Sequence, residues 1–473
     1  MDTLLHPIIN WLNGILWGYI LIYLLLGVGA YFTLRLGFIQ GRIFHSTLFK
    51  KEPGLSGKGI TGFEAFATGV ASRVGTGNIV GVAVALTVGG PGAIFWMWVV
   101  ALLGMSSAFV EATLAQIFKV KNDDGSFRGG PSYYIQNGLR SRALGIVFSL
   151  LLILAFGFVF NAVQAQSIAE TMDISFGIPR AWVGVALVLI VAPVIFGGIR
   201  RVAKLAAVIV PTMALGYLGV AFFVLLTHLP ALPGILSMIV KSAFGIEQAA
   251  GGAVGYAITV AMMTGIKRGL FSNEAGMGSA PNAAAAANAS HPVSQGLLQM
   301  IGVVMDTMII CTATALIILL SGQYVPGAEM QGASLTHAAI TTHLGPAGGL
   351  FLTVAIFFFA YSSVLGNYAY AESNVQFISK HPLLLLIFRL CVLGMVMFGS
   401  IGSLPLIWDM ADTSMGLMAL INLIAIVLLG KYAYAAWKDY LDQKKRGINI
   451  PIFTRASIPE LQDKLAKDVW HGT

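Results

Sequence analysis

The sequence predicts an all-α protein that crosses a membrane many times, and three observations carry this prediction. Of the 473 residues, 57% are hydrophobic and only 10% are charged, whereas a soluble domain normally carries about 25% charged residues. Apolar segments of the length that a membrane helix needs, about 20 residues, recur along the chain. Lysine and arginine gather in alternate connections between these segments. So few charges cannot coat a soluble protein, and most of the surface must face lipid.

About eleven segments are apolar and long enough to be predicted as transmembrane helices. The first lacks a basic stretch before it and a small-residue cleavage site after it, so we expect it to remain as a span. Cys311 and Cys391 lie inside apolar segments, which predicts packing thiols rather than a disulfide framework. The predicted spans lie near residues 14–34, 63–88, 93–118, 144–170, 181–199, 203–227, 253–275, 294–321, 347–377, 384–402 and 409–430.

The basic residues predict how the chain is oriented. They follow the first, third, fifth and last segments, while the other connections hold almost none. Because lysine and arginine resist translocation, this pattern predicts an outside N-terminus and a cytoplasmic C-terminus in a bacterial-type inner membrane. The net charge of +8 is then explained by topology, and no nucleic-acid partner is expected.

Two of the predicted spans contain helix-breaking sequence. The second holds Gly-Thr-Gly-Asn at residues 75–78, and the seventh holds glycines at positions 265, 269, 276 and 278. Glycine inside a helix costs about 1 kcal/mol relative to alanine, and unwound backbone in a membrane must be paired by a ligand, an ion or water. The alternative is that these glycines only let helices pack closely.

The two interrupted spans occupy matching places in the chain. Each opens a set of five spans, 2–6 and 7–11, and the two sets enter the membrane from opposite sides. Interrupted helices at corresponding positions of inverted halves are typical of a transporter with its site at mid-membrane. We expect an extra N-terminal helix and loop (1–58), a core of two halves (59–228 and 229–430) and a basic cytoplasmic tail (431–473).

Two motifs resemble the alanine or glycine:cation symporter family. They are GGPGAIFWMW at residues 89–98, continuing to Gly104, and RGLFSNEAG at 268–276, continuing to Gly278-Ser279-Ala280-Pro281. The similarity extends from about residue 14 to 430. The resemblance implies the leucine-transporter fold, with one extra helix before a five-plus-five inverted repeat whose second and seventh helices are discontinuous. It also implies sodium- or proton-coupled uptake of alanine and glycine.

A zwitterionic amino acid needs donors for its carboxylate and acceptors for its ammonium. The N-terminus of a half-helix offers exposed N–H groups and a positive dipole end. Carbonyls near Thr264, Gly265 and Ile266 would accept from the ammonium; an intact helix there is the alternative. Asn161 and Gln164 lie three residues apart in the fourth span and either contact the substrate or join helices. The expected carboxylate site is the backbone of Gly75, Thr76, Gly77 and Asn78.

The resemblance also suggests where sodium binds, because the fold that it implies holds one sodium between the first and the eighth core helices. Carried over by position, the ligands would be the carbonyl oxygens of Ala71 and Val74 and the hydroxyl groups of Ser362 and Ser363. The serine pair is weak evidence by itself, since serine commonly hydrogen-bonds within membrane helices.

Three ionisable residues within spans are further candidates, since charges in a membrane are rarely without function. Asp306 would neutralise a cation or pair with a base. Arg73 would form an inner-gate ion pair with Glu274 or Glu64.

These features predict a secondary active transporter that moves a small neutral amino acid inward with sodium and needs no cofactor. A proton-coupled carrier of another small amino acid or metabolite stays open. A channel would need a continuous pore, usually formed by symmetric subunits. An enzyme is not expected, because the chain has no HExxH, GxSxG or P-loop motif and its Gly75-x-Gly77-x-x-x-Gly81 run fails the dinucleotide spacing. A monomer would suffice, since the expected site lies within one chain.

Overall fold

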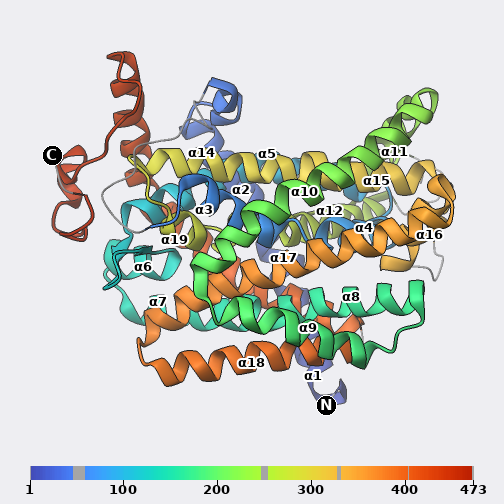
Figure 1. Ribbon diagram of the computed structural model, residues 1–473. Coiled ribbons are helices and arrows are strands. Elements are labelled where there is room, and N and C mark those ends of the chain that lie inside the picture. The colour runs from blue at the N-terminus through green and yellow to red at the C-terminus, as the bar shows by residue number, and fades with distance from the viewer. Residues whose placement is uncertain (1, 46–58, 247–253, 327–331, 403, 471–473) are drawn as a thin grey trace.

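Long helices lying side by side make up almost all of the computed structural model (Figure 1). The structure describes residues 2–45, 59–246, 254–326, 332–402 and 404–470. In this part of the chain the strands are β1 (Val120–Lys121) and β2 (Phe127–Arg128), which form one antiparallel pair. The predicted loop after the first span falls partly outside the described residues, at 46–58.

The first span is continuous, with one π-helical turn in its middle. It consists of α1 (Asp2–Ile15), η1 (Leu16–Ile20) and α2 (Leu21–Arg35), and the 3-10 turn η2 (Ile39–His45) follows. Trp17 is wholly buried and its indole N–H donates to the Asp412 carbonyl oxygen at 3.2 Å. The N-terminal helix therefore packs against the last long helix of the chain.

The second span is discontinuous, as expected. It comprises α3 (Gly62–Arg73), the π-helical turn η3 (Gly77–Gly81) and α4 (Val82–Gly89), and it bends by 47° at the break. A capping box starts α3: the Glu64 N–H donates to the Thr61 hydroxyl at 3.1 Å, and the Thr61 N–H donates to the Glu64 carboxylate at 2.8 Å. The helix α3 ends at Arg73, because the next residue, Val74, has a ψ of 87°, which is not helical.

The seventh predicted span is also interrupted, but further along the chain than expected. The helix α12 (Val254–Asn273) is continuous, and α13 (Pro281–Ala286) follows after an irregular stretch at 274–280. Glu274, Gly276 and Gly278 have φ angles of 59°, 86° and 86°, in the left-handed region that favours glycine. The backbone therefore leaves the helix here.

The expectation that carbonyl groups are released near Thr264, Gly265 and Ile266 is wrong, because these residues lie inside α12. Glycine serves another purpose at this position. A Cβ atom on Gly265 would lie 2.3 Å from the Ala93 carbonyl oxygen, and one on Gly269 would lie 2.6 Å from the Val100 side chain. These two glycines let α12 approach α5 closely. At these positions the alternative given above, that the glycines only let helices pack closely, is therefore the correct one.

The other helices complete the bundle. Before the seventh span they are α5 (Gly92–Ile117), α6 (Pro131–Gly138), α7 (Arg142–Leu152), η4 (Ile153–Val159), α8 (Phe160–Phe176), α9 (Arg180–Ile195), α10 (Gly198–Thr227), η5 (Leu229–Ala231) and α11 (Leu232–Ala243). After it they are α14 (Pro292–Val303), η7 (Val304–Cys311), α15 (Thr312–Leu320), α16 (Gly332–Leu344), α17 (Pro346–Ile378), α18 (Pro382–Ile401), α19 (Leu404–Lys445), η8 (Arg455–Ser457) and η9 (Pro459–Leu461).

Within the described residues, eight helices are long and apolar enough to cross a membrane, or nine if the bent α3–α4 pair counts as one span. The two remaining predicted spans correspond to α9, which is 16 residues long, and α12. The chain is thus a multi-pass membrane protein, while the count of eleven and the inverted repeat stay predictions.

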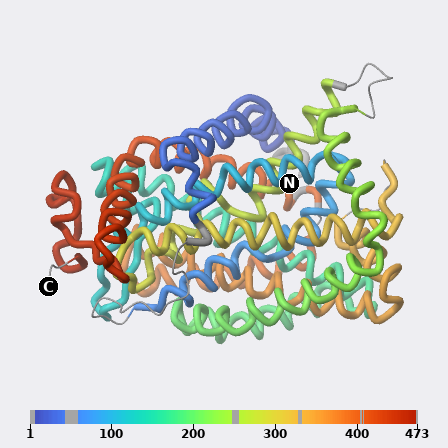
Figure 2. Tube along the Cα trace, turned by 90° about the horizontal axis from the view of Figure 1, so that it is seen from above, coloured from blue at the N-terminus to red at the C-terminus, as the bar shows by residue number. Residues whose placement is uncertain are grey.

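The C-terminal segment marks one end of the bundle, with α11 and α16 at the opposite end (Figures 1 and 2). We call these the tail end and the far end. The helix α19 continues through residue 430, where the tail was expected to begin, and ends at Lys445. The following segment is compact rather than extended, because Phe453, Leu461 and Trp470 are all wholly buried.

Candidate functional site

The break in the second span is buried inside the bundle and is held by side-chain oxygens. The Gly75 N–H donates to Asn78 Oδ1 at 2.9 Å, and the Thr76 N–H donates to Gln164 Oε1 at 3.0 Å. The Thr76 hydroxyl is buried and has no hydrogen-bond partner among the described residues. Two of the expected carboxylate donors are thus occupied by amide oxygens, which a substrate carboxylate would have to replace.

Glycine is sterically required at this break. A Cβ atom on Gly75 would lie 2.2 Å from Ser363 Oγ and 2.9 Å from Gln164 Oε1. One on Gly77 would lie 2.9 Å from the Phe271 ring. Real Cβ atoms do not approach other atoms so closely, so a larger residue at either position would force its neighbours to move. The neighbouring side chains belong to α8, α12 and α17, which therefore pack directly against the break.

Three of the four expected sodium ligands come together. Ser363 Oγ donates to the Ala71 carbonyl at 2.9 Å and lies 3.5 Å from the Val74 carbonyl. Ser362 is directed elsewhere: its hydroxyl donates to the Phe359 carbonyl at 2.9 Å and lies 3.6 Å from the Met213 sulfur on α10. Both hydroxyls reach the Phe359 carbonyl, but only that of Ser363 also lies beside the Ala71 and Val74 carbonyls.

Asp306 on η7 is wholly buried beside the same break. Its carboxylate accepts hydrogen bonds from Asn78 Nδ2, Ser272 Oγ and Thr307 Oγ1, each at 2.7 Å. No basic side chain of the described residues forms an ion pair with it. A carboxylate at membrane depth needs a counter-charge or a proton, and this oxygen-rich pocket suits a small cation. Sequence reasoning missed Ser272 and Thr307, because single hydroxyl residues in a membrane helix are common.

Asn161 joins helices. Its carbonyl oxygen accepts from Asn367 Nδ2 on α17 at 3.2 Å, and its own Nδ2 donates to the Gly157 carbonyl at 3.0 Å. The chain of hydrogen bonds continues from Ser72 Oγ to Asn367 Oδ1 at 2.7 Å and to Glu274 Oε1 at 2.6 Å. These polar groups link the two breaks, whereas Gln164 alone of the two amides contacts the backbone of the second span.

The expected ion pair of Arg73 is not formed in this conformation. Arg73 Nη1 donates to the Gln299 carbonyl at 3.1 Å, and its Nε and Nη2 are buried without a partner among the described residues. Glu64 is occupied by the helix cap, and Glu274 accepts from Ser72 and from Ser279 Oγ at 2.6 Å. Both carboxylates are therefore already hydrogen-bonded.

The second break is clamped by two residues that sequence reasoning missed. The Gly276 N–H donates to Glu111 Oε1 on α5 at 3.2 Å. Asn422 Nδ2 on α19 donates both to Glu111 Oε2 at 2.8 Å and to the Gly276 carbonyl at 2.9 Å. Glu111 could have been found from sequence, because a glutamate inside an apolar span is a functional candidate by default.

Aromatic and charged groups cover the site on the side of α12 and α19. The Phe271 ring stacks on Phe160 and lies against Trp408, with ring centroids 4.6 Å apart in both cases. The Arg268 guanidinium lies 4.5 Å from the Trp408 ring centre and donates to the buried Asp412 carboxylate.

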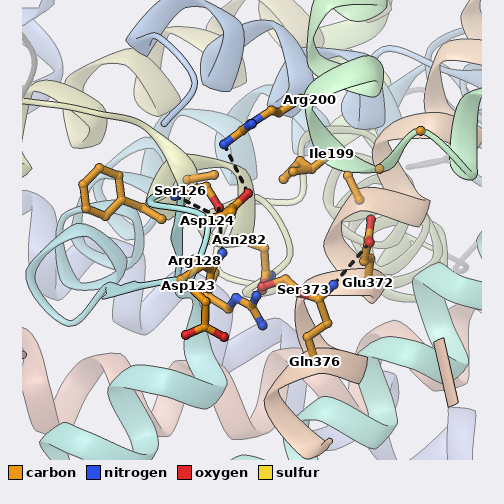
Figure 3. Close-up of a pocket in the computed structure, with 16 residues that line it drawn as sticks. Asp123, Asp124, Ser126, Arg128, Ile199, Arg200, Asn282, Glu372, Ser373 and Gln376 are labelled. Carbon is orange, nitrogen blue, oxygen red and sulfur yellow. Dashed lines mark hydrogen bonds and ion pairs between the residues drawn. The ribbon is translucent and has the colours of Figure 1, made fainter. Parts of the chain in front are cut away.

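A cavity of about 460 Å³ opens near the tail end, between the β1–β2 hairpin, the start of α10, α13 and α17 (Figure 3). Asp124 on its rim is paired with Arg200 at 3.1 Å. Partial burial acts to raise the pKa of Asp124, but hydrogen bonds from Ser126 and the charge of Arg200 lower it on balance. Asn282 connects the cavity to the second break, since its Nδ2 donates to the Ser279 carbonyl at 2.7 Å.

The chain matches known transporters over nearly its whole length. The model of the sodium:alanine symporter family matches residues 1–455. The amino-acid carrier protein AlsT of Bacillus subtilis is 49% identical, over 98% of both chains. The probable sodium/glutamine symporter GlnT of the same organism is 48% identical, over 96% of this chain and 94% of the relative. The sodium/alanine symporter AgcS of Methanococcus maripaludis is 39% identical, over 93% and 98%.

Proposed function

Because the chain belongs to the sodium:alanine symporter family, we propose that it couples inward movement of alanine or glycine to a sodium gradient by alternating access. Its relatives are amino-acid carriers and symporters, so the chain is a membrane transporter of amino acids and cations and not an enzyme. The finer points, which are the substrate, the cation and the residues that bind them, are argued below from the geometry of the breaks.

The observation that carries the proposal is the break between α3 and η3. Peptide N–H groups of Gly75 and Thr76 are held there by amide oxygens of Asn78 and Gln164, in a part of the bundle that is wholly buried. A carboxylate offers the same kind of acceptor with a full negative charge, and charge-assisted hydrogen bonds are about twice as strong as neutral ones. The substrate carboxylate would therefore displace these amide oxygens.

The substrate ammonium would be received at the end of α12. The last carbonyl groups of a helix lack intrahelical partners, and α12 ends at Asn273 because Glu274 turns out of the helix. Carbonyl groups of residues 271–273 are then available close to the first break, because a Cβ atom on Gly77 would lie 2.9 Å from the Phe271 ring.

Sodium has two proposed positions beside the substrate. One is formed by the carbonyl groups of Ala71 and Val74 and the hydroxyl of Ser363, which are all neutral oxygens. The other is formed by the Asp306 carboxylate with the hydroxyls of Ser272 and Thr307. Hard cations prefer oxygen ligands of this kind. Asp306 would also be the natural site for a proton, which keeps the proton-coupled carrier as the alternative.

The pocket should accept only small side chains. Gly75 and Gly77 leave no room for even one additional carbon atom, and the Phe271 ring closes the site opposite Gly77. Crowding of this kind excludes each added methylene more strongly than chemistry does. We therefore propose that alanine, glycine and serine are transported while leucine is not, and glutamine is a necessary competitor in the test because one relative is named for it.

The distribution of lysine and arginine supports an orientation with the N-terminus outside and the tail end in the cytoplasm of a bacterial-type inner membrane. In that orientation Arg73 and Glu274 lie on the cytoplasmic side of the substrate. They are the proposed inner gate, because two nitrogen atoms of Arg73 are buried without a partner among the described residues. A shift of the second break would bring a carboxylate to these nitrogen atoms.

Uptake of radiolabelled alanine into proteoliposomes, with sodium and proton gradients imposed separately, tests the proposal. Sodium alone should drive accumulation, glycine and serine should compete, and leucine and glutamine should not. Accumulation driven only by a proton gradient would establish the alternative, and strong competition by leucine would refute the small pocket.

The two adjacent serines of α17 provide a matched pair of variants. Ser363→Ala removes a proposed sodium ligand and should raise the sodium concentration needed for half-maximal uptake by about tenfold. This factor corresponds to about 1.4 kcal/mol, which is the loss expected for one strong polar contact. Ser362→Ala removes a hydroxyl that faces its own helix and should leave the sodium dependence unchanged. Equal behaviour of the two variants would remove Ser363 from the sodium site.

A further inference from the structure

The C-terminal segment, residues 446–470, folds back onto the tail end of the bundle (Figures 1 and 2). The Trp470 indole N–H donates to the Ile117 carbonyl at the end of α5 at 3.2 Å. The Phe453 N–H donates to the Ser290 carbonyl, in the connection between α13 and α14, at 3.0 Å, and the Arg455 N–H donates to the Trp470 carbonyl at 3.3 Å. Both anchoring rings, of Phe453 and Trp470, are wholly buried, so the segment is docked by its side chains as well as its backbone.

The docked segment encloses the ammonium group of Lys119. This residue is wholly buried, and its Nζ lies 4.4 Å from the Phe127 ring centre and 4.6 Å from that of Trp470. Nζ donates to Gln116 Oε1 at 2.7 Å and to the Ala287 carbonyl at 2.9 Å. Within the described ranges it forms no ion pair with a carboxylate. Since burying a charge is costly, the two rings and the two oxygen atoms are what keep it in place.

The same contacts attach the tail-end halves of both interrupted spans. The Ala287 carbonyl, which Lys119 binds, belongs to the residue directly after α13, and Gln116 Nε2 donates to it as well at 3.1 Å. The next residue, Asn288, donates its N–H to the Ile60 carbonyl at 2.9 Å, just before α3 begins. The C-terminal segment, the end of α5, the end of α13 and the start of α3 are therefore one connected block.

We propose that residues 446–470 act as a strap that holds α13 against α5 and thereby slows opening of the transport site towards the tail end. The proposal rests on the proposed function, because alternating access requires one part of the core to move against the other around the central site. Any movement of α13 away from α5 must break the bonds to Ala287 and Ser290. Loss of Trp470 would admit water to Lys119, and this water would compete for the Ala287 carbonyl.

A labelling experiment tests the strap without reference to transport. Ser290→Cys, in a chain that also carries Cys391→Ser, places a thiol under the docked segment, where Ser290 is 5% exposed. Adding Trp470→Ala should speed its reaction with a water-soluble maleimide by about fivefold, since a cation–π contact contributes about 1 kcal/mol and 1.4 kcal/mol corresponds to tenfold. The matched control is Ile452→Ala in the same segment, because the Ile452 side chain is 52% exposed and only its backbone is bonded, to Gln443.

Transport gives the second readout. Initial rates of alanine uptake should rise in Trp470→Ala and stay at the wild-type value in Ile452→Ala. Equal labelling rates in Trp470→Ala and the wild type, or slower uptake in a variant that labels faster, would overturn the strap. If the wild type moved no alanine, the proposed function would be refuted. The labelling comparison would still show whether the C-terminal segment shields Ser290. Should Trp470→Ala not purify as a single species, Phe453→Ala removes the other anchor and carries the same expectations.

Discussion

Replacing Gly75 by alanine is the sharpest test of the central break. The added Cβ would lie 2.2 Å from Ser363 Oγ and 2.9 Å from Gln164 Oε1. The serine hydroxyl cannot yield easily, because it is bonded to the Ala71 carbonyl at 2.9 Å and to the Phe359 carbonyl at 3.0 Å. Overpacking of this kind costs about 1–3 kcal/mol, which corresponds to about a 5- to 150-fold loss of the binding-competent conformation.

Gly81, on the same interrupted span, is the matched control. A Cβ atom there would lie 3.6 Å from the Trp408 ring, an ordinary van der Waals contact, and alanine has the better helix propensity. In proteoliposomes with an inward sodium gradient, Gly75→Ala should lower the initial rate of alanine uptake by at least about fivefold. Gly81→Ala should stay within about twofold of the wild type. Equal uptake by the two variants would refute the steric reasoning.

A double variant separates crowding from loss of the cation ligand. Combining Gly75→Ala with Ser363→Ala removes the atom that the new methyl group meets most closely, so thermal stability in detergent should recover towards the wild-type value. Uptake should not recover, because the hydroxyl of Ser363 is a proposed sodium ligand. Full recovery of uptake would mean that this hydroxyl only fills space.

Three further outcomes follow from buried charges. Asp412→Asn leaves Arg268 without its counter-charge, which should destabilise the protein by about 3–5 kcal/mol in a detergent unfolding assay; an unchanged midpoint would show that the pair is not formed. Asp306→Asn keeps the shape of its pocket but removes the charge, so sodium-driven uptake should fall while binding of alanine at high sodium persists, and loss of both would indicate a structural role. Arg73→Glu should abolish uptake while membrane expression persists, and normal uptake would remove Arg73 from the gate.

The interrupted second span was predictable because its signal is local. Gly75, Thr76, Gly77 and Asn78 are consecutive, and such a run disfavours a helix whatever surrounds it. The seventh span shows the limit of this reasoning. Gly265 and Gly276 look alike in sequence, yet Gly265 packs against Ala93 inside a regular helix and Gly276 has a φ of 86° in the break. Only the neighbouring helix decides between these two uses of glycine.

The sequence by itself determined the membrane class, the windows in which helices form and the burial of a few polar residues within them, since composition and periodicity reflect the surrounding lipid directly. Tertiary structure alone decided the partners of those residues. Asp412 pairs with Arg268 across 144 positions of the chain, and Ser363 rather than Ser362 faces Ala71 across 292. Contacts between such distant positions depend on how whole helices pack and rotate against each other, and no local pattern of residues encodes that.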